Sequence, residues 1–108
     1  MEISEIYVHD AQLRRVIEDV EADLILMQVD LPILELDEEL QPRFLVFEDA
    51  YNYQVFELPF QGPVTILNMH VIGRNGRWQQ VRLETNGGYR DLFCVRVRVR
   101  VSTENPFA

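Results

Sequence analysis

The chain has 108 residues, of which 47% are hydrophobic and 26% are charged, and its only cysteine is Cys94. A chain of this length is in the size range of one domain, here residues 1–108, and its apolar content excludes a disordered polypeptide. Eighteen acids against ten basic residues, all of them arginine, give a net charge of −8, which disfavours nucleic acids and anionic membranes as partners because phosphate binding needs a positive surface.

Residues 11–21 fit two kinds of element. Their apolar residues from Leu13 to Val20 have the spacing of a helix face, but three of these four are β-branched. Arginines near the start and acids near the end would also oppose the helix dipole. We therefore predict a strand, with a possible bulge, that pairs with residues 23–31.

The middle of the chain predicts three more strands. Residues 24–31 form an apolar strand that we expect to end at Pro32, and residues 35–40 an acidic loop or short helical turn. Residues 43–48 and 53–58 are rich in aromatic and β-branched side chains, which favour strands. We predict that these two segments form a hairpin.

The last third of the chain has the clearest pattern. Residues 64–72 and 77–85 flank a turn sequence with two glycines, which predicts a hairpin. Residues 89–101 alternate apolar and polar side chains, as only a strand does. Residues 64–101 are therefore predicted to form a three-stranded antiparallel meander, and residues 104–108 a mobile tail.

Three-residue loops at both turns of this meander set its expected register. They pair Met69 with Val81 and Val81 with Phe93, which keeps apolar residues on one face. They also place Trp78 opposite Arg96 and Glu84 opposite Arg90. The predicted core face holds Leu67, Met69, Val71, Val81, Leu83, Phe93 and Val95. The predicted outer face holds Asn68, His70, Trp78, Gln80, Arg82, Cys94, Arg96 and Arg98.

Together these elements predict an all-β or β-dominated fold. We expect an antiparallel meander packed as a small sandwich or a partly open barrel of about seven to eight strands. No stretch has the length of a membrane span or the pattern of a secretion signal, and a single cysteine cannot form an internal disulfide. We therefore expect a cytoplasmic protein.

The outer face of the meander is a candidate binding surface. Tryptophan and arginine are enriched at binding hot spots, and arginine recognises carboxylates in a planar geometry. The alternative is that the acidic half of the chain covers this face as a second layer, or that the face is simply solvated. The candidate binding residues are Asn68, His70, Trp78, Gln80, Arg82, Arg96 and Arg98.

Charge is distributed unevenly along the chain. Residues 1–42 hold twelve acids and two arginines, whereas residues 74–108 hold three acids and seven arginines. The two sets could neutralise each other within the monomer, or the acidic set could meet a basic partner and speed its encounter. The candidate acidic surface consists of Glu35, Asp37, Glu38 and Glu39, together with Glu18, Asp19, Glu21 and Asp23.

Short motifs resemble those of a known group of proteins. The opening His9-Asp10-Ala11, the strand end at residues 29–31 and the segment 57–64 are similar to small bacterial β-rich domains of unknown function, some of which are described as immunity proteins of toxin systems. The resemblance implies a β-dominated fold and a protein-binding role. It supplies no catalytic residues.

Catalytic and metal-binding motifs are weakly represented. His9 and Asp10 are adjacent, but neighbours on a strand point to opposite faces, so a turn-closing role is the simpler interpretation. His9, His70 and Cys94 lack the spacing of metal ligands, and an isolated cysteine is expected to be a packed thiol. We therefore predict neither a metal nor a cofactor.

Three functions from different classes remain open. The first is a non-catalytic, immunity-like protein-interaction domain that binds a basic partner through its acidic half. The second is a homodimer that assembles through the arginine-rich last strand, although arginines on an edge strand can also prevent pairing. The third is a binder of a small anionic ligand, or an enzyme acting on one, that uses His70 and Arg82.

Overall fold

The computed structural model describes residues 2–101, and within them it contains eight β-strands and two short 3-10 turns. The chain is therefore all-β. The expected tail at 104–108 lies outside the described residues. The strands are β1 (Ala11–Asp19), β2 (Leu24–Ile33), β3 (Glu39–Glu48), β4 (Tyr51–Glu57), β5 (Val64–Asn75), β6 (Trp78–Thr85), β7 (Gly88–Cys94) and β8 (Arg96–Val101), and the 3-10 turns are η1 (Ile3–Glu5) and η2 (Leu34–Leu36).

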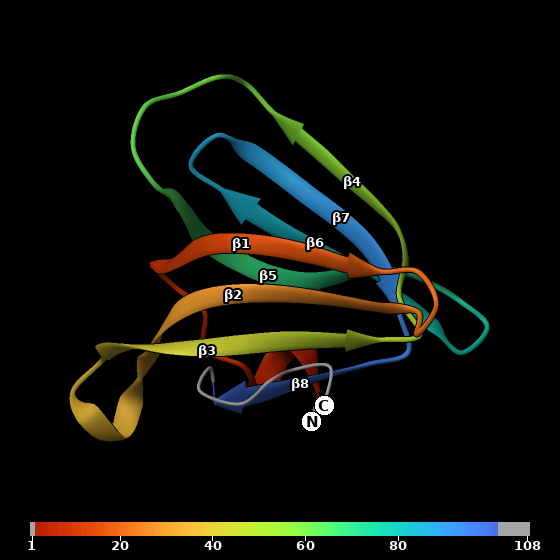
Figure 1. Cartoon of the computed structure of the whole chain (residues 1–108), viewed down its shortest axis with the longest axis horizontal. Coiled ribbons are helices and arrows are strands. Elements are labelled where there is room, and N and C mark those ends of the chain that lie inside the picture. The colour runs from red at the N-terminus through yellow and green to blue at the C-terminus, as the bar shows by residue number, and fades with distance from the viewer. Residues whose placement is uncertain (1, 102–108) are drawn as a thin grey trace.

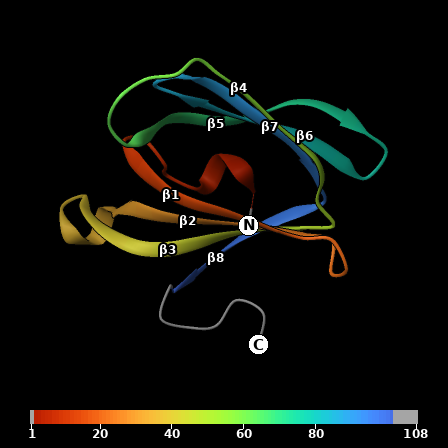
Figure 2. The same cartoon turned by 45° about the horizontal axis from the view of Figure 1, so that its top comes forward.

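All eight strands belong to one antiparallel sheet with the order β4-β7-β6-β5-β1-β2-β3-β8. The sheet bends so that β4, β7, β6 and β5 form one layer and β1, β2, β3 and β8 form the other (Figures 1 and 2). Strand pairing between the two layers is limited to three residue pairs of β1 and β5, from Ala11↔Ile66 to Leu13↔Val64. The outermost strands β4 and β8 do not pair, so the sheet is not closed into a barrel.

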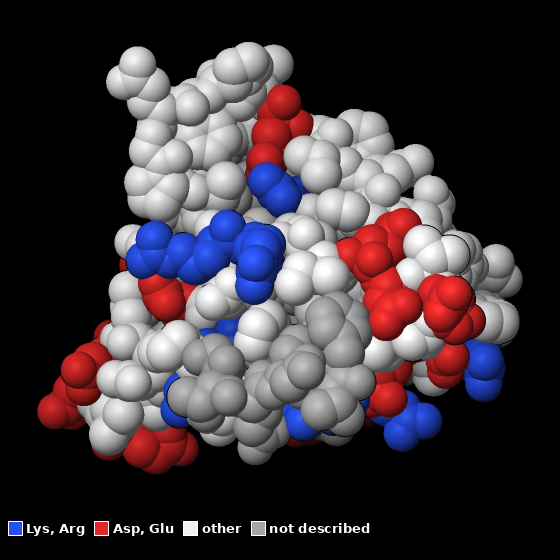
Figure 3. Space-filling model, in the orientation of Figure 1, with Lys and Arg blue, Asp and Glu red and all other residues white. Residues whose placement is uncertain are grey.

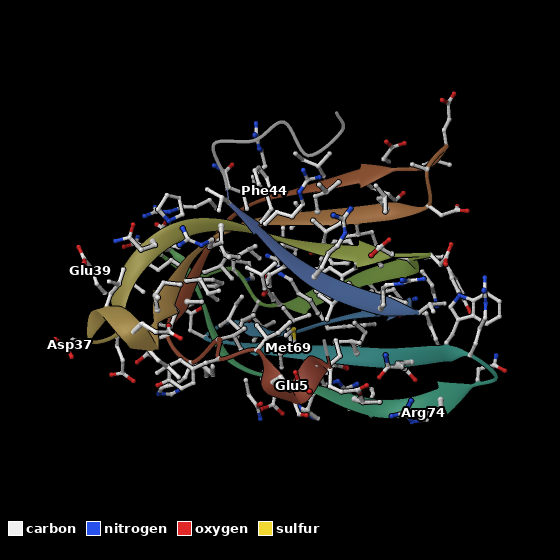
Figure 4. All side chains as sticks on the ribbon, turned by 90° about the horizontal axis from the view of Figure 1, so that it is seen from below. Glu5, Asp37, Glu39, Phe44, Met69 and Arg74 are labelled. Atoms are coloured by element: carbon white, nitrogen blue, oxygen red, sulfur yellow. The ribbon has the colours of Figure 1, made fainter. Side chains whose placement is uncertain are left out.

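The main hydrophobic core lies between the two layers. Strands of both layers contribute fully buried side chains, including Phe47 and Leu83, and Met69 is labelled between the ribbons in Figure 4. The N-terminal segment adds Ile3, Ile6 and Val8 to this core, and Figure 2 shows η1 between the layers. A second, smaller cluster of Leu26, Phe44 and Val46 involves β2 and β3.

The first predicted strand is confirmed. β1 pairs with β2 from Gln12↔Asp30 to Asp19↔Leu24, and its register shifts between Leu13 and Arg15, where the bulge lies. The β-branched residues and the unfavourable helix charges therefore outweighed the helical spacing of the apolar positions.

The prediction that β2 ends at Pro32 is wrong, because β2 continues to Ile33 and Pro32 pairs with Leu40 of β3. β1 pairs with β2 only as far as Asp30, so at Pro32 the strand has a single neighbour. A missing N–H is tolerated where one side of a strand is unpaired. The acidic segment that follows is a short turn, as predicted, with η2 and a left-handed Asp37.

The predicted hairpin of residues 43–48 and 53–58 is wrong. Both segments are strands, but β3 pairs with β2 and β8, whereas β4 pairs with β7. Between them, Asp49 and Asn52 adopt left-handed backbone conformations, with φ of 51° and 57°. The Ala50 amide donates a hydrogen bond to the Asp23 carbonyl at 2.7 Å. This connection carries the chain from one layer to the other.

The meander of β5, β6 and β7 is confirmed, but its turns contain two residues each and its register differs. Met69 pairs with Leu83, two positions from the prediction, which keeps both side chains in the core. Val81 pairs with Leu92 rather than Phe93, a slip of one residue that exchanges the faces of β7. Leu92 and Cys94 are therefore buried, and Phe93 and Val95 are not core residues.

The positions of two further residues of the meander, Leu67 and Arg90, differ from the prediction. Leu67 lies in a bulge of β5 and is 43% exposed, while its neighbour Ile66 is fully buried. Arg90 of β7 pairs with Leu83 of β6, so the expected pair of Glu84 and Arg90 does not form.

The predicted strand at 89–101 is in fact two strands. It breaks at Val95, after which β8 leaves the meander and pairs with β3 in the other layer. Val97 faces the core at 2% exposure, whereas Arg96 and Arg98 are exposed. No helix in residues 2–101 is long and apolar enough to cross a membrane.

Candidate functional site

The outer face of the layer β4-β7-β6-β5 gathers most of the predicted binding residues. Burial alternates along β6, so that Trp78, Gln80 and Arg82 point away from the core while the odd-numbered residues point into it. Asn68 and His70 join them on β5, where His70 pairs with Arg82. These five predicted residues therefore share one face.

Three other residues predicted for this face lie elsewhere. Arg96 and Arg98 are on β8, at the far end of the strand order, where their Nε atoms lie 3.9 and 3.1 Å from Glu48 Oε1. Trp78 pairs with Asn75 and not with Arg96. Cys94 is fully buried, and this burial raises the pKa of its thiol to about 12, so that Cys94 is a packed, protonated thiol.

Aromatic side chains that the sequence did not point to complete this face. Tyr51 stacks on Phe93 with ring centroids 5.2 Å apart, and it also contacts Trp78 edge-on at 6.0 Å. Phe56 stacks on Tyr89 at 4.9 Å. Tyr51 and Phe56 remain 43% and 45% exposed. We call these five residues, Tyr51, Phe56, Trp78, Tyr89 and Phe93, the aromatic face.

Arg82 is held within the aromatic face by its own neighbours. Its Nε and Nη2 donate hydrogen bonds to the two carboxylate oxygens of Asp91, both at 2.9 Å, and its guanidinium lies 4.0 Å from the Tyr89 ring centroid. The hydrogen bonds that Arg82 donates to Asp91 raise the pKa of Arg82. Because two donors of the Arg82 guanidinium already bind the Asp91 carboxylate, Arg82 holds Tyr89 and Asp91 in place and does not offer these donors to a ligand.

A second arginine, Arg90, belongs to a buried polar cluster that also contains Glu57, Tyr53 and Thr85. We call it the Glu57 cluster. Arg90 donates to the Glu57 carboxylate at 2.7 and 2.9 Å and to Tyr53 Oη at 2.8 Å, and Thr85 Oγ1 donates to Glu57 at 2.7 Å. These hydrogen bonds, above all those from Arg90, lower the pKa of Glu57. Burial raises the pKa of Tyr53. The cluster satisfies its own polar groups and joins β4 to β6 and β7.

The two histidines line a cleft of about 420 Å³ between the N-terminal segment and β5. His9 Nδ1 lies 3.1 Å from the Leu67 carbonyl, and its Nε2 lies 3.5 Å from Asp10, at an exposed turn where Asp10 has a φ of 66°. His70 Nδ1 is buried without a hydrogen-bond partner. Among residues 2–101, no group of three or more His, Cys, Asp or Glu side chains is arranged to hold a metal ion.

The predicted acidic surface is divided between two ends of the molecule, which corrects the expectation of a single surface. β2 separates its two parts: Glu35, Asp37, Glu38 and Glu39 lie at the β2–β3 connection, and Glu18, Asp19, Glu21 and Asp23 lie at the β1–β2 turn. Figure 3 shows acidic side chains gathered in both areas, and Figure 4 shows Asp37 and Glu39 at the end opposite Arg74.

The acidic group at the β2–β3 connection, which we call the acidic tip, lies among exposed leucines. Leu34, Leu36 and Leu40 are 58%, 47% and 42% exposed. Tyr7 Oη donates a hydrogen bond to Glu38 at 2.8 Å, and this bond raises the pKa of Tyr7. The bond ties the tip to the N-terminal segment.

At the end of the molecule that holds the β1–β2 turn, acidic residues lie beside the aromatic face. A recess of about 270 Å³ is lined by Asp23, Asp49, Ala50, Tyr51, Arg77 and Trp78. A smaller recess of about 120 Å³ shares Asp23, Ala50 and Tyr51 with it and adds Glu18 and Asp19. We call the two together the acidic recess. Its left-handed residues Asp23 and Asp49 are of a type that tolerates this conformation.

No protein-family model matches this sequence, and no curated protein does. The resemblance to small bacterial β-rich domains stays a prediction. Functional inference therefore rests on the geometry of the acidic recess, the acidic tip and the aromatic face.

Proposed function

We propose that this domain is a non-catalytic protein-interaction module that binds a basic partner protein at the acidic recess and the adjoining aromatic face. One observation carries the proposal: carboxylates from the β1–β2 turn and from Asp49 border the same recess as Trp78 and Tyr51. Aromatic residues of these types dominate binding energy at protein interfaces, and charges at the rim steer the encounter.

The rest of the molecule supports the same function. The net charge of −8 attracts a basic protein over a long range, and the exposed aromatic side chains supply apolar area for contact. An immunity-like role in bacteria, as the sequence resemblance implies, would have this form, because such a protein acts by binding. The proposal includes a reducing, cytoplasmic setting, which the free and buried Cys94 supports.

Two matched double variants test which acidic group binds. Asp19→Asn with Asp23→Asn removes two charges from the recess, and Glu35→Gln with Glu39→Gln removes two from the acidic tip. Asparagine retains the side-chain oxygen of Asp19, which accepts the Ala22 N–H at 3.2 Å, and tolerates the left-handed φ of 55° at position 23. We expect the recess variant to weaken binding of a basic partner protein, purified on the wild-type domain, by about tenfold. The tip variant should change it less than about twofold.

Titration calorimetry at two salt concentrations measures both effects. Equal losses in the two variants would mean that only net charge matters, and a loss confined to the tip variant would move the binding surface to the leucines there. Either result would overturn the proposed site. If the wild-type domain retained no basic protein at all, the proposed function itself would be wrong.

Self-association through β8 is the second candidate, and one observation favours it. Among residues 2–101, β8 pairs only with β3, so within this part of the chain it is an edge strand of the kind that can pair with another chain. An antiparallel pair of two β8 strands would bring Arg96 and Arg98 near the arginines of the second copy, and this repulsion is strongest at low salt. A dimer should therefore strengthen as salt is raised in a light-scattering series. A monomer at every salt concentration would eliminate this candidate.

A further inference from the structure

The acidic recess already holds a guanidinium group, which comes from the chain itself. Arg77 follows Gly76 in the two-residue turn between β5 and β6. Its Cζ lies 4.8 Å from the centroid of the Trp78 ring, and its Nη2 lies 3.8 Å from Asp49 Oδ2. A cation above an indole and beside a carboxylate is a general way to recognise arginine.

The indole is fixed as a platform for such a group. Trp78 Nε1 donates a hydrogen bond to the Asp49 carbonyl at 3.2 Å, and Tyr51 contacts the Trp78 ring edge-on with an interplanar angle of 81°. Asp49 lies in the connection between β3 and β4, and Tyr51 is the first residue of β4. The ring is therefore positioned by tertiary contacts and not by Arg77.

Arg77 is held far less firmly than the other arginine on this face. Arg82 makes two hydrogen bonds of 2.9 Å to Asp91, whereas the closest approach of Arg77 to Asp49 exceeds hydrogen-bond length. The Arg77 side chain is 63% exposed and the Asp49 side chain 44%. An exposed pair of this kind contributes little to stability, so another guanidinium can replace Arg77 at little cost.

We propose that the acidic recess is a binding site for an arginine side chain of the partner, and that Arg77 is an intramolecular occupant which the partner's arginine displaces. This inference rests on the proposed function for the existence of a basic partner. Arginine is favoured over lysine because the planar guanidinium stacks on the ring while it donates to Asp49 and Asp23. Removal of Arg77 should therefore strengthen binding.

The test uses peptides of four arginines or four lysines and two matched variants. Trp78 is the only tryptophan, so its fluorescence reports binding at the recess itself. Arg77→Gln removes the occupant. Arg74→Gln makes the same change of charge on β5 of the same hairpin, where Arg74 pairs with Gln79 (Figure 4).

We expect Arg77→Gln to lower the Kd for tetra-arginine about two- to fivefold relative to Arg74→Gln, the range that corresponds to loss of one exposed competing cation–π contact. The gain should be smaller for tetra-lysine. Asp49→Asn, which tolerates the left-handed φ of 51°, should raise the Kd for tetra-arginine.

Three results separate the two proposals. Equal Kd values for the Arg77 and Arg74 variants would overturn the role of Arg77 while leaving a basic partner at the recess. Binding detected by calorimetry without any change in Trp78 fluorescence would place the peptide away from the recess and refute the site. If neither peptide bound any variant, while the basic partner protein still bound, the arginine assignment would be wrong and the proposed function would stand.

Discussion

Replacing Arg90 by methionine is expected to lower the free energy of unfolding by about 3 to 5 kcal/mol. Arg90 and Glu57 are only 15% and 8% exposed, and they form two hydrogen bonds to each other. Methionine fills much of the volume of arginine but leaves the Glu57 carboxylate buried without a cation. Urea denaturation at neutral pH measures the loss.

A second variant separates the loss of the ion pair from the loss of packing. Glu57→Gln combined with Arg90→Met leaves no buried charge, so the double variant should be more stable than Arg90→Met alone. If Arg90→Met cost less than about 1 kcal/mol, water would have to reach Glu57, and the cluster would not be the buried pair described above.

The pH dependence of stability provides a further check on the same cluster. The hydrogen bonds from Arg90 lower the pKa of Glu57 in the folded state, so the unfolded chain binds this proton more readily. The contribution of Glu57 is therefore complete above the usual glutamate pKa of about 4.3 and is lost as the pH falls through the lower folded value. Glu57→Gln should remove this part of the acid sensitivity.

Replacing Gly88 by alanine is expected to destabilise the domain by about 3 kcal/mol or more, because two separate costs act at this position. Gly88 has a φ of 152°, which side chains rarely adopt, and an added Cβ would lie 2.1 Å from the Phe56 carbonyl oxygen. Gly88 pairs with Glu57 on one side and with Thr85 on the other. Relief of this clash must push β4 away from β7.

Gly76→Ala is the matched control. Gly76 also has a positive φ, of 61°, but an added Cβ would meet nothing within 4 Å. Only backbone strain remains there, about 1 to 2 kcal/mol. Comparison of the two variants by urea denaturation therefore isolates the clash with β4. Equal losses would show that β4 can move away from β7 without cost.

The type of most elements could be read from the sequence, but the register of the two strand pairs in the meander could not. β-branched residues and charge placement identified β1, and turn residues identified the hairpin of β5 and β6. At residues 86–88 the sequence allows turns of two or three residues, and a difference of one exchanges Leu92 with Phe93. Both residues are apolar, so composition did not reveal which of them lies in the core.

The break between β7 and β8 at Val95 could not be predicted from the sequence, for a similar reason. Cys94 and Val97 both face the core, so strict alternation fails between them. Because Phe93, Val95, Val97 and Val99 are all apolar, the pattern nevertheless reads as one continuous strand. The path of the chain after Glu48 was equally inaccessible, since the left-handed turn there depends on a contact with Asp23.

The candidate site was predictable in part. Alternation along β6 correctly grouped Trp78 and Arg82 on one face. The acidic recess, however, brings together the separate turns that hold Asp23, Asp49 and Arg77, which only tertiary packing makes neighbours. No local pattern in the sequence indicates that these turns meet.

The departure of β8 from the meander has a consequence for biosynthesis. β8 completes the layer that contains β1, β2 and β3, yet it is translated after all the other strands. Until it emerges from the ribosome, β3 has one unpaired side and Phe47 lacks its neighbour Val97. Pairing on this side of β3 must therefore wait until β8 has been translated, and in that interval the open edge of β3 is exposed to pairing with other chains.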